Sequence, residues 1–166
     1  MKIDKLTAIL GLSVGAGALL ADRVTKIAVM KGAVRQGPAF FSWLEITIHH
    51  NFGLLGNLAV PRILILLFSL LALGVLAYGL FDALKYNRRM DFIALCLVLG
   101  GALGNLYDRE TYVYVFDWLM FFKTSIINFS DAFITIGLIM YAIGQFVRKI
   151  ENKDVDCHET QTKIER

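Results

Sequence analysis

Apolar residues gather in four long runs that are separated by shorter polar stretches. The runs extend from about Leu6 to Met30, Val60 to Leu84, Phe92 to Tyr107 and Phe129 to Val147. A helix needs roughly 20 apolar residues to cross the hydrocarbon core of a bilayer, with a working range of about 17–25. The first, second and fourth runs have this length, while the third is slightly short and must end near an interface. The pattern predicts four transmembrane helices.

Lys and Arg residues near the ends of these runs indicate how the chain is oriented, because such residues concentrate on the cytoplasmic side of membrane helices. They flank the runs at Lys2, Lys5, Lys85, Arg88, Arg89, Arg148 and Lys149. We therefore expect both termini to be cytoplasmic and the loops at 31–59 and 108–128 to face outward. The outer loops also carry cations, so the bias is modest.

Both outer loops contain short stretches rich in β-forming residues, Phe40–Ile48 and Tyr112–Phe116. They predict a small sheet on the outer membrane surface, with Phe40, Phe41 and Trp43 suited to the interfacial aromatic belt. The predicted fold class is an all-α membrane protein of four transmembrane helices with a small β-rich extracytoplasmic element. Residues 1–150 form this domain. The polar residues 151–166 are expected to be a disordered cytoplasmic tail.

Composition supports a membrane domain and excludes several functions. Hydrophobic residues make up 57% of the chain and the mean hydropathy is +0.60, whereas soluble domains are about 45–50% apolar. The net charge is only +3 and no dense Lys/Arg run occurs, so no nucleic-acid partner is expected. Cys96 and Cys157 form neither a metal spacing nor a disulfide framework. With three histidines in the chain, we expect no metal and no cofactor.

The first apolar run has a basic start and could be read as a secretory signal. Apolar sequence continues beyond its small residues, however, and Asp22 and Lys26 follow at helical spacing, so we expect a retained helix. The spacings Gly11 to Gly15 and Gly100 to Gly104 resemble small-xxx-small helix contacts. Close packing within one chain is favoured over dimerisation for both.

Several polar residues interrupt the apolar sequence where predicted helices meet water, and polar groups in a membrane usually mark function. Asp22 and Lys26 have the favourable i,i+4 order for a helical ion pair, so a structural role is favoured. Asp108 and Arg109 are adjacent, and each is expected to anchor the end of the third helix or the following loop. Asn51 and Asn105 lie near segment ends and could cap a helix or hold a substrate backbone group.

Asp117 and Asp131 are the candidates for chemistry. Asp117 lies among aromatic residues, where poor solvation should raise its pKa. Asp131 follows Asn128 and Ser130 at the start of the fourth run, where an ordinary helix-terminal acid is the competing interpretation. The helix terminus should make Asp131 the more readily ionised acid, leaving the shared proton on Asp117.

Two carboxylates held close together share one proton, which supplies a base to activate water and an acid to polarise a peptide carbonyl. This is the aspartic-protease solution, and it needs no metal or covalent intermediate. No His-Glu-x-x-His motif of a metalloprotease occurs in the chain. From the residues alone, the catalytic and structural interpretations of the pair both stay open.

Five motifs in order carry a family resemblance. Residues 22–26 resemble Asp-x-x-Thr-Lys, and residues 51–53 resemble Asn-x-Gly. Residues 100–109 fit Gly-Gly-Ala-x-Gly-Asn-x-x-Asp-Arg at every fixed position. Residues 115–118 resemble Val-Val-Asp-Phe, and residues 128–131 resemble Asn-x-Ala-Asp. Together they resemble lipoprotein signal peptidase (signal peptidase II), a family of four-helix aspartic peptidases of the bacterial inner membrane.

The resemblance spans roughly Ala21 to Gly144 and implies roles for individual residues. It implies that Asp117 and Asp131 are the catalytic dyad. Residues that support or line the site would be Asp22, Lys26, Asn51, Gly53, Gly104, Asn105, Asp108, Arg109 and Asn128.

The resemblance also implies a substrate, a diacylglyceryl-modified prolipoprotein cut on the amino side of its lipobox cysteine at the outer membrane face. The acyl chains would stay in membrane lipid while the bond meets water. Cyclic peptide inhibitors of the globomycin type are also expected.

Departures from the family pattern concern the loops rather than the acids. Residues 54–56 (Leu-Leu-Gly) replace the usual Ala-Ala-Phe, Ser130 replaces Ala, and Trp118 and Ile127 replace Phe. They bear on substrate and inhibitor preference. The alternatives to an endopeptidase are a non-catalytic membrane homologue that binds lipidated peptides and a small proton-coupled carrier. The lack of an internal repeat counts against the carrier.

Overall fold

Four helices dominate the structure, a computed structural model that describes residues 3–38, 41–53 and 60–164. They are α1 (Lys5–Met30), α2 (Arg62–Lys85), α3 (Arg89–Tyr112) and α4 (Phe129–Ile164). Within the described residues, these four are long and apolar enough to cross a membrane. The predicted fold class is confirmed, including a small antiparallel sheet.

Helix α3 is the central element of the bundle, because it packs against each of the other three helices. Its contact with α1 depends on two glycines. A Cβ atom added to Gly15 would lie 2.6 Å from the backbone oxygen of Cys96, and one added to Gly100 would overlap the backbone oxygen of Gly15. The small-residue spacings therefore serve packing within one chain, as predicted.

A buried ion pair joins α3 to α4 at the end of the bundle remote from the sheet. The Asp91 side chain, at 1% exposure, accepts hydrogen bonds from both terminal nitrogens of Arg148 at 3.0 and 2.6 Å, and from Gln145 at 3.2 Å. Because a doubly bonded Arg–carboxylate pair has a specific geometry, it helps to fix the relative height of the two helices.

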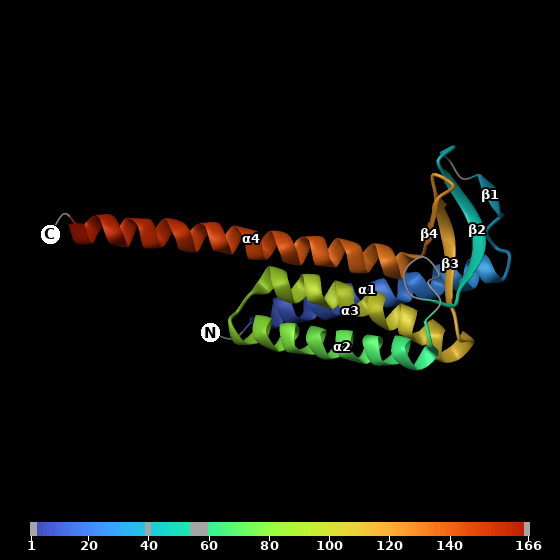
Figure 1. The fold of residues 1–166 in the computed structure, drawn as a ribbon, viewed down its shortest axis with the longest axis horizontal. Helices are drawn as coiled ribbons and strands as arrows, with labels where there is room; N and C mark the ends of the chain where they lie inside the picture. Colours follow the sequence, from blue (N-terminus) through green and yellow to red (C-terminus); the bar gives the residue numbers. More distant parts are fainter. Residues whose placement is uncertain (1–2, 39–40, 54–59, 165–166) are drawn as a thin grey trace.

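Helix α4 is longer than the sequence indicated. It continues to Ile164 beyond the bundle, whereas we predicted disorder for residues 151–166. Neither Gly nor Pro occurs between Gly144 and Ile164, so nothing in the backbone chemistry stops the helix. Both ends of the chain lie at the end of the bundle opposite to the sheet (Figure 1).

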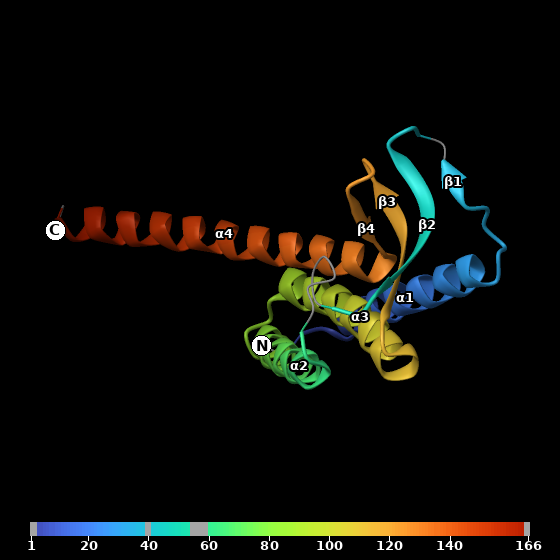
Figure 2. The same cartoon turned by 45° about the vertical axis from the view of Figure 1, so that its right-hand side comes forward.

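The sheet lies across the other end of the bundle, and its strands run across the helix axes (Figures 1 and 2). Its strands are β1 (Gly37–Pro38), β2 (Leu44–Asn51), β3 (Val115–Phe121) and β4 (Ser125–Ile127), paired antiparallel in the order β1-β2-β3-β4. The central pair joins the α1–α2 connection to the α3–α4 connection, with His49 opposite Asp117 and Asn51 opposite Val115.

The strands start later in the chain than the predicted stretches Phe40–Ile48 and Tyr112–Phe116. Helix α3 continues past the apolar run to Tyr112, and Val113 ends it in the left-handed conformation with φ 71°. The polar residues that seemed to end this run are buried against other elements and so remain helical. Phe40 and residues 54–56 lie outside the described residues.

Candidate active site

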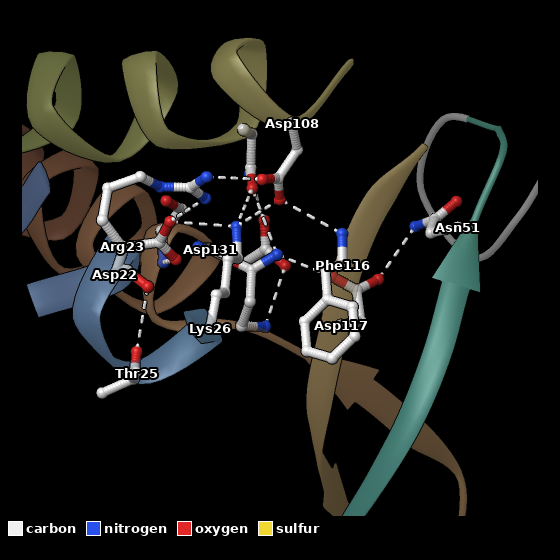
Figure 3. A network of polar contacts seen from close by, with 12 residues as sticks. Asp22, Arg23, Thr25, Lys26, Asn51, Asp108, Phe116, Asp117 and Asp131 are labelled. Atoms are coloured by element: carbon white, nitrogen blue, oxygen red, sulfur yellow. Dashed lines mark hydrogen bonds and ion pairs between the residues drawn. The ribbon is translucent and has the colours of Figure 1, made fainter. Parts of the chain in front are cut away.

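A cluster of buried charges occupies the end of the bundle where α1, α3 and the sheet meet (Figure 3). Lys26, at 1% exposure, contacts Asp22 at 2.9 Å and Asp108 at 2.7 Å. Arg23 contacts the same two carboxylates, each at 2.7 Å. Two cations therefore neutralise two anions that could not be buried alone. The predicted Asp22–Lys26 ion pair is confirmed and is one part of this larger cluster.

The two carboxylates of this cluster also hold backbone groups. Asp108 accepts a hydrogen bond from the Phe116 N–H at 3.1 Å, and Asp22 accepts one from the Ser130 N–H at 3.0 Å. Phe116 directly precedes Asp117, and Ser130 directly precedes Asp131. The ion cluster thus fixes the backbone immediately before each of the two candidate acids. We predicted that Asp108 anchors the end of the third helix or the following loop, and its hydrogen bond to the Phe116 N–H is such an anchor.

Asp117 lies on β3 with 1% of its surface exposed. Neighbouring residues Phe116 and Trp118 point to the opposite side of the strand, where both belong to an apolar cluster. One Asp117 oxygen accepts from the Asn128 amide at 2.6 Å and the other from the Asn51 amide at 3.1 Å. The Asn51 amide is itself oriented by the Gly53 N–H, which donates to its oxygen at 3.1 Å.

Asp131 lies in the first turn of α4 and forms a reciprocal cap with Asn128. The Asp131 N–H donates to the Asn128 side-chain oxygen at 3.0 Å, and the Asn128 N–H donates to an Asp131 carboxylate oxygen at 3.3 Å. This is the geometry of a capping box with Asp in the usual Glu position. The other carboxylate oxygen accepts from Asn105 at 2.7 Å. Asp131 is therefore a helix-capping acid with a further contact to α3.

Asn128, which is fully buried, connects the two acids. Its amide group donates to Asp117 and also to the Asn105 oxygen at 3.1 Å, while its oxygen is occupied by Asp131. Since three asparagines supply most of the donors, both carboxylates are held by neutral groups, which orient them without supplying a compensating charge.

A cavity of about 570 Å³ opens beside both acids. Asp117 and Asp131 line it together with residues of β2, α3, β4 and α4, among them His49, Asn51, Asn105, Arg109, Ile126, Ile127, Ile134 and Thr135. The polar side chains converge beside an apolar wall formed by Val115, Ile126, Ile127 and Ile134, an arrangement that suits a substrate cleft. Arg109 lies within electrostatic range of Asp131, Asp117 and Asp108 and brings positive charge to this cleft.

The environment of Asp117 raises its pKa from 3.8 to about 6. Burial is the largest cause, because it disfavours the charged form, and the nearby Asp131 charge adds to it. Hydrogen bonds from Asn51 and Asn128 act in the opposite direction. The rise agrees in direction with the expectation that Asp117 holds a shared proton. The order of ionisation within the pair remains a prediction.

All the residues singled out in the sequence converge on this region. Gly104 makes room for the contact between α3 and the start of α4, since an added Cβ would overlap the Ser130 hydroxyl and lie 2.8 Å from Asp22. Two residues were not identified from the sequence. Arg23 lies inside the first motif and is the second cation of the ion cluster, while His49 lines the cleft opposite Asp117. The position of His49 beside Asp117 follows from the pairing of β2 with β3, which the sequence alone does not give.

Comparison with known proteins settles the family. A sequence profile described as signal peptidase (SPase) II matches residues 14–147. This chain belongs to the signal peptidase II family. The chain is 34% identical over 145 residues to a lipoprotein signal peptidase from Clostridium acetobutylicum, covering 82% of this chain and 92% of that one. It is 33% identical over 144 residues to one from Ectopseudomonas mendocina, covering 77% and 82%.

The fold of this signal peptidase II family member also matches a solved structure. A bacterial membrane enzyme determined in meso at 2.3 Å resolution superposes with a TM-score of 0.77 and 27% identity, covering 92% of this chain and 94% of that chain. Signal peptidase II is an aspartic peptidase family whose members remove signal peptides from prolipoproteins. The predicted family, membrane architecture and peptidase class are therefore confirmed.

Proposed function

We propose that Asp117 and Asp131 are the catalytic dyad of this signal peptidase. The observation that carries the proposal is their joint placement. Two acids from β3 and α4 line one cleft, and the amide of Asn128 bonds one of them while its oxygen accepts the backbone N–H of the other. The raised pKa of Asp117 supports a dyad that keeps one proton up to about pH 6, above the usual range of a carboxyl group.

In the proposed reaction, the ionised acid removes a proton from a water molecule and the protonated acid donates a hydrogen bond to the scissile carbonyl. Water oxygen then attacks the carbonyl carbon and forms a tetrahedral intermediate. Its collapse breaks the C–N bond, and a proton passes from the dyad to the leaving amine. Asn51, Asn105 and Asn128 keep both carboxylates oriented throughout, so little reorganisation is needed.

The proposed substrate is a prolipoprotein that already carries diacylglycerol on its lipobox cysteine, cut on the amino side of that cysteine. The position of the cleft at the end of the helices where the sheet packs supports this, because acyl chains can remain in lipid while the peptide enters the cleft. A cyclic peptide of the globomycin type would act by occupying the same cleft.

The proposed location is the inner membrane, with the sheet and cleft at the outer face and both termini in the cytoplasm. The placement of both chain ends at the opposite end of the bundle from the sheet supports a common side for the termini. The cations Lys85, Arg88 and Arg89 between α2 and α3 lie at that same end.

The direct test uses purified full-length protein and a diacylglyceryl-modified prolipoprotein. We expect cleavage by the wild type, and a loss of at least about 1,000-fold in Asp117→Asn and Asp131→Asn, as when one member of a catalytic unit is removed. Asp82→Asn is the matched control, since Asp82 pairs with Arg88 at the other end of the bundle.

Three outcomes would overturn the proposal or a part of it. Retained cleavage in either dyad variant would show that the acid is not catalytic. Failure of the wild type to cleave any lipidated prolipoprotein, while still binding it, would favour the non-catalytic lipopeptide-binding alternative. Equal cleavage of a substrate without diacylglycerol would refute the role assigned to the lipid.

A further inference from the structure

Two adjacent histidines on β2 face in opposite directions, because successive side chains of a strand alternate between its two sides. The His50 ring packs at a tilt against Tyr114, with ring centroids 4.3 Å apart, and against Phe116 at 6.1 Å. His49 therefore lies on the other side of the strand. That is the side from which Asn51, two residues further on, donates to Asp117.

The register of the sheet places His49 directly beside the candidate dyad. His49 pairs with Asp117 across β2 and β3, and paired residues on neighbouring strands carry side chains on the same face, with Cβ atoms about 4.5–5.5 Å apart. His49 and Asp117 line the same cavity of about 570 Å³. The imidazole is thus a polar group in the cleft next to the reacting position.

The His49 imidazole makes no polar contact that stabilises the described part of the fold. In the part of the chain that the structure describes, no hydrogen bond, ion pair or ring contact involves it, and the side chain is partly exposed to the cleft. A neutral imidazole has one N–H donor and one acceptor nitrogen. When a peptide fills the cleft and excludes water, these groups need new partners, since a buried polar group without one is costly.

We propose that His49 is a substrate-contacting residue that hydrogen-bonds the substrate backbone next to the scissile bond, on the β2 side of the dyad. An extended peptide offers a carbonyl oxygen and an N–H at each residue, so this contact needs no particular substrate side chain. It places His49 with the residues that hold the peptide rather than with those that transfer protons. The inference rests on the proposed function, since the contact is defined relative to the dyad.

The first test compares His49→Ala with His50→Ala on the diacylglyceryl prolipoprotein. His49→Ala should lower kcat/KM by about 3- to 10-fold, the size expected for one neutral hydrogen bond, with an unchanged pH profile. His49→Gln or His49→Asn, which restore an N–H near one ring nitrogen or the other, should recover most of the loss. His50→Ala removes a ring of the same size from the opposite face and should leave kcat/KM within about 2-fold of the wild type.

A second measurement detects the contact itself. A photo-crosslinking benzoylphenylalanine is placed at position 49 or at position 50 in the Asp131→Asn protein, so that bound substrate is not consumed. Crosslinks to the prolipoprotein are expected from position 49 and not from position 50. This readout does not depend on activity, so it remains informative if His49→Ala reduces stability.

Several results would overturn the inference. Wild-type kcat/KM in His49→Ala would exclude an energetic contact, and equal crosslinking from both positions would exclude the proposed face. A shifted pH profile with unchanged KM would mean that His49 acts on the ionisation of Asp117 instead. A wild-type protein that never cleaves the substrate would refute the proposed function, which separates that failure from failure of the His49 contact alone.

Discussion

Replacing Asp117 by Asn tests how the fold tolerates a buried acid. The pKa of Asp117 rises from 3.8 to about 6 in the folded protein, which corresponds to about 3 kcal/mol of unfavourable ionisation at neutral pH. Asn has nearly the same shape and carries no charge. Its oxygen can accept from only one of Asn51 and Asn128, however, and the unmatched amide costs about 1–3 kcal/mol. At pH 7.5 the variant should therefore be as stable as the wild type or up to about 2 kcal/mol more stable.

The pH dependence gives the sharper signature. Between pH 3.8 and 6 the folded protein binds more protons at Asp117 than the unfolded chain does, so this residue makes wild-type stability fall as pH rises through that window. About 2 kcal/mol of that fall lies between pH 4.5 and 7.5. Asp117→Asn should lack it, and its melting temperature relative to the wild type should rise by about 4–8 °C over this range.

The assay is thermal unfolding of the purified proteins in one detergent at closely spaced pH values. Asp131→Asn serves as the comparison, because it keeps Asp117 buried but removes the second cause of its raised pKa. That variant should retain most of the pH dependence if burial is the main cause. Parallel melting curves for the wild type and Asp117→Asn between pH 4.5 and 7.5 would refute the reasoning.

Three other substitutions test the surrounding structure. Lys26→Met leaves Asp22 and Asp108 with Arg23 as their one remaining partner in the cluster, so it should destabilise the protein by about 3–5 kcal/mol in thermal unfolding; a change below 1 kcal/mol would contradict this. Ser130→Ala removes a buried hydroxyl that has no hydrogen-bond partner among the described residues, so cleavage and melting temperature should be unchanged or improved. Gly104→Ala forces a methyl group against the Ser130 hydroxyl and should destabilise by about 1–3 kcal/mol, measured in the same unfolding assay. Combining it with Ser130→Ala should restore part of the loss, and strict additivity of the two changes would argue against the clash.

Local patterns in the chain were sufficient to predict the membrane helices and their number. The cost of leaving backbone groups unpaired in lipid makes long apolar runs helical regardless of what they pack against. Local polarity also identified Asp117 and Asp131 as candidates, since acidic residues beside long apolar runs stand out in the sequence. The Asp22–Lys26 pair was also predictable, because an i,i+4 spacing on one helix sets its own geometry.

Element ends were harder to predict, because partners distant in the chain decide them. Helix α3 passes its apparent apolar end because Asn105 and Asp108 are buried against α1, β3 and α4. When the partners of such polar residues are unknown, the sequence pattern wrongly predicts that the helix ends at them. For the residues after Ile150 the error had the opposite sign. Their polar composition predicts disorder, while the backbone of α4 continues as a helix.

The chain alone therefore determined which segments are apolar enough to span a membrane and which acids are candidates for chemistry, because both follow from local polarity. The tertiary structure decided how those acids are held. Strand pairing brought His49 to Asp117, and the ion cluster of Asp22 and Asp108 fixed the backbone before each acid. These contacts join segments up to 108 positions apart, and no local pattern specifies them because they form only when the helices and the sheet are packed together.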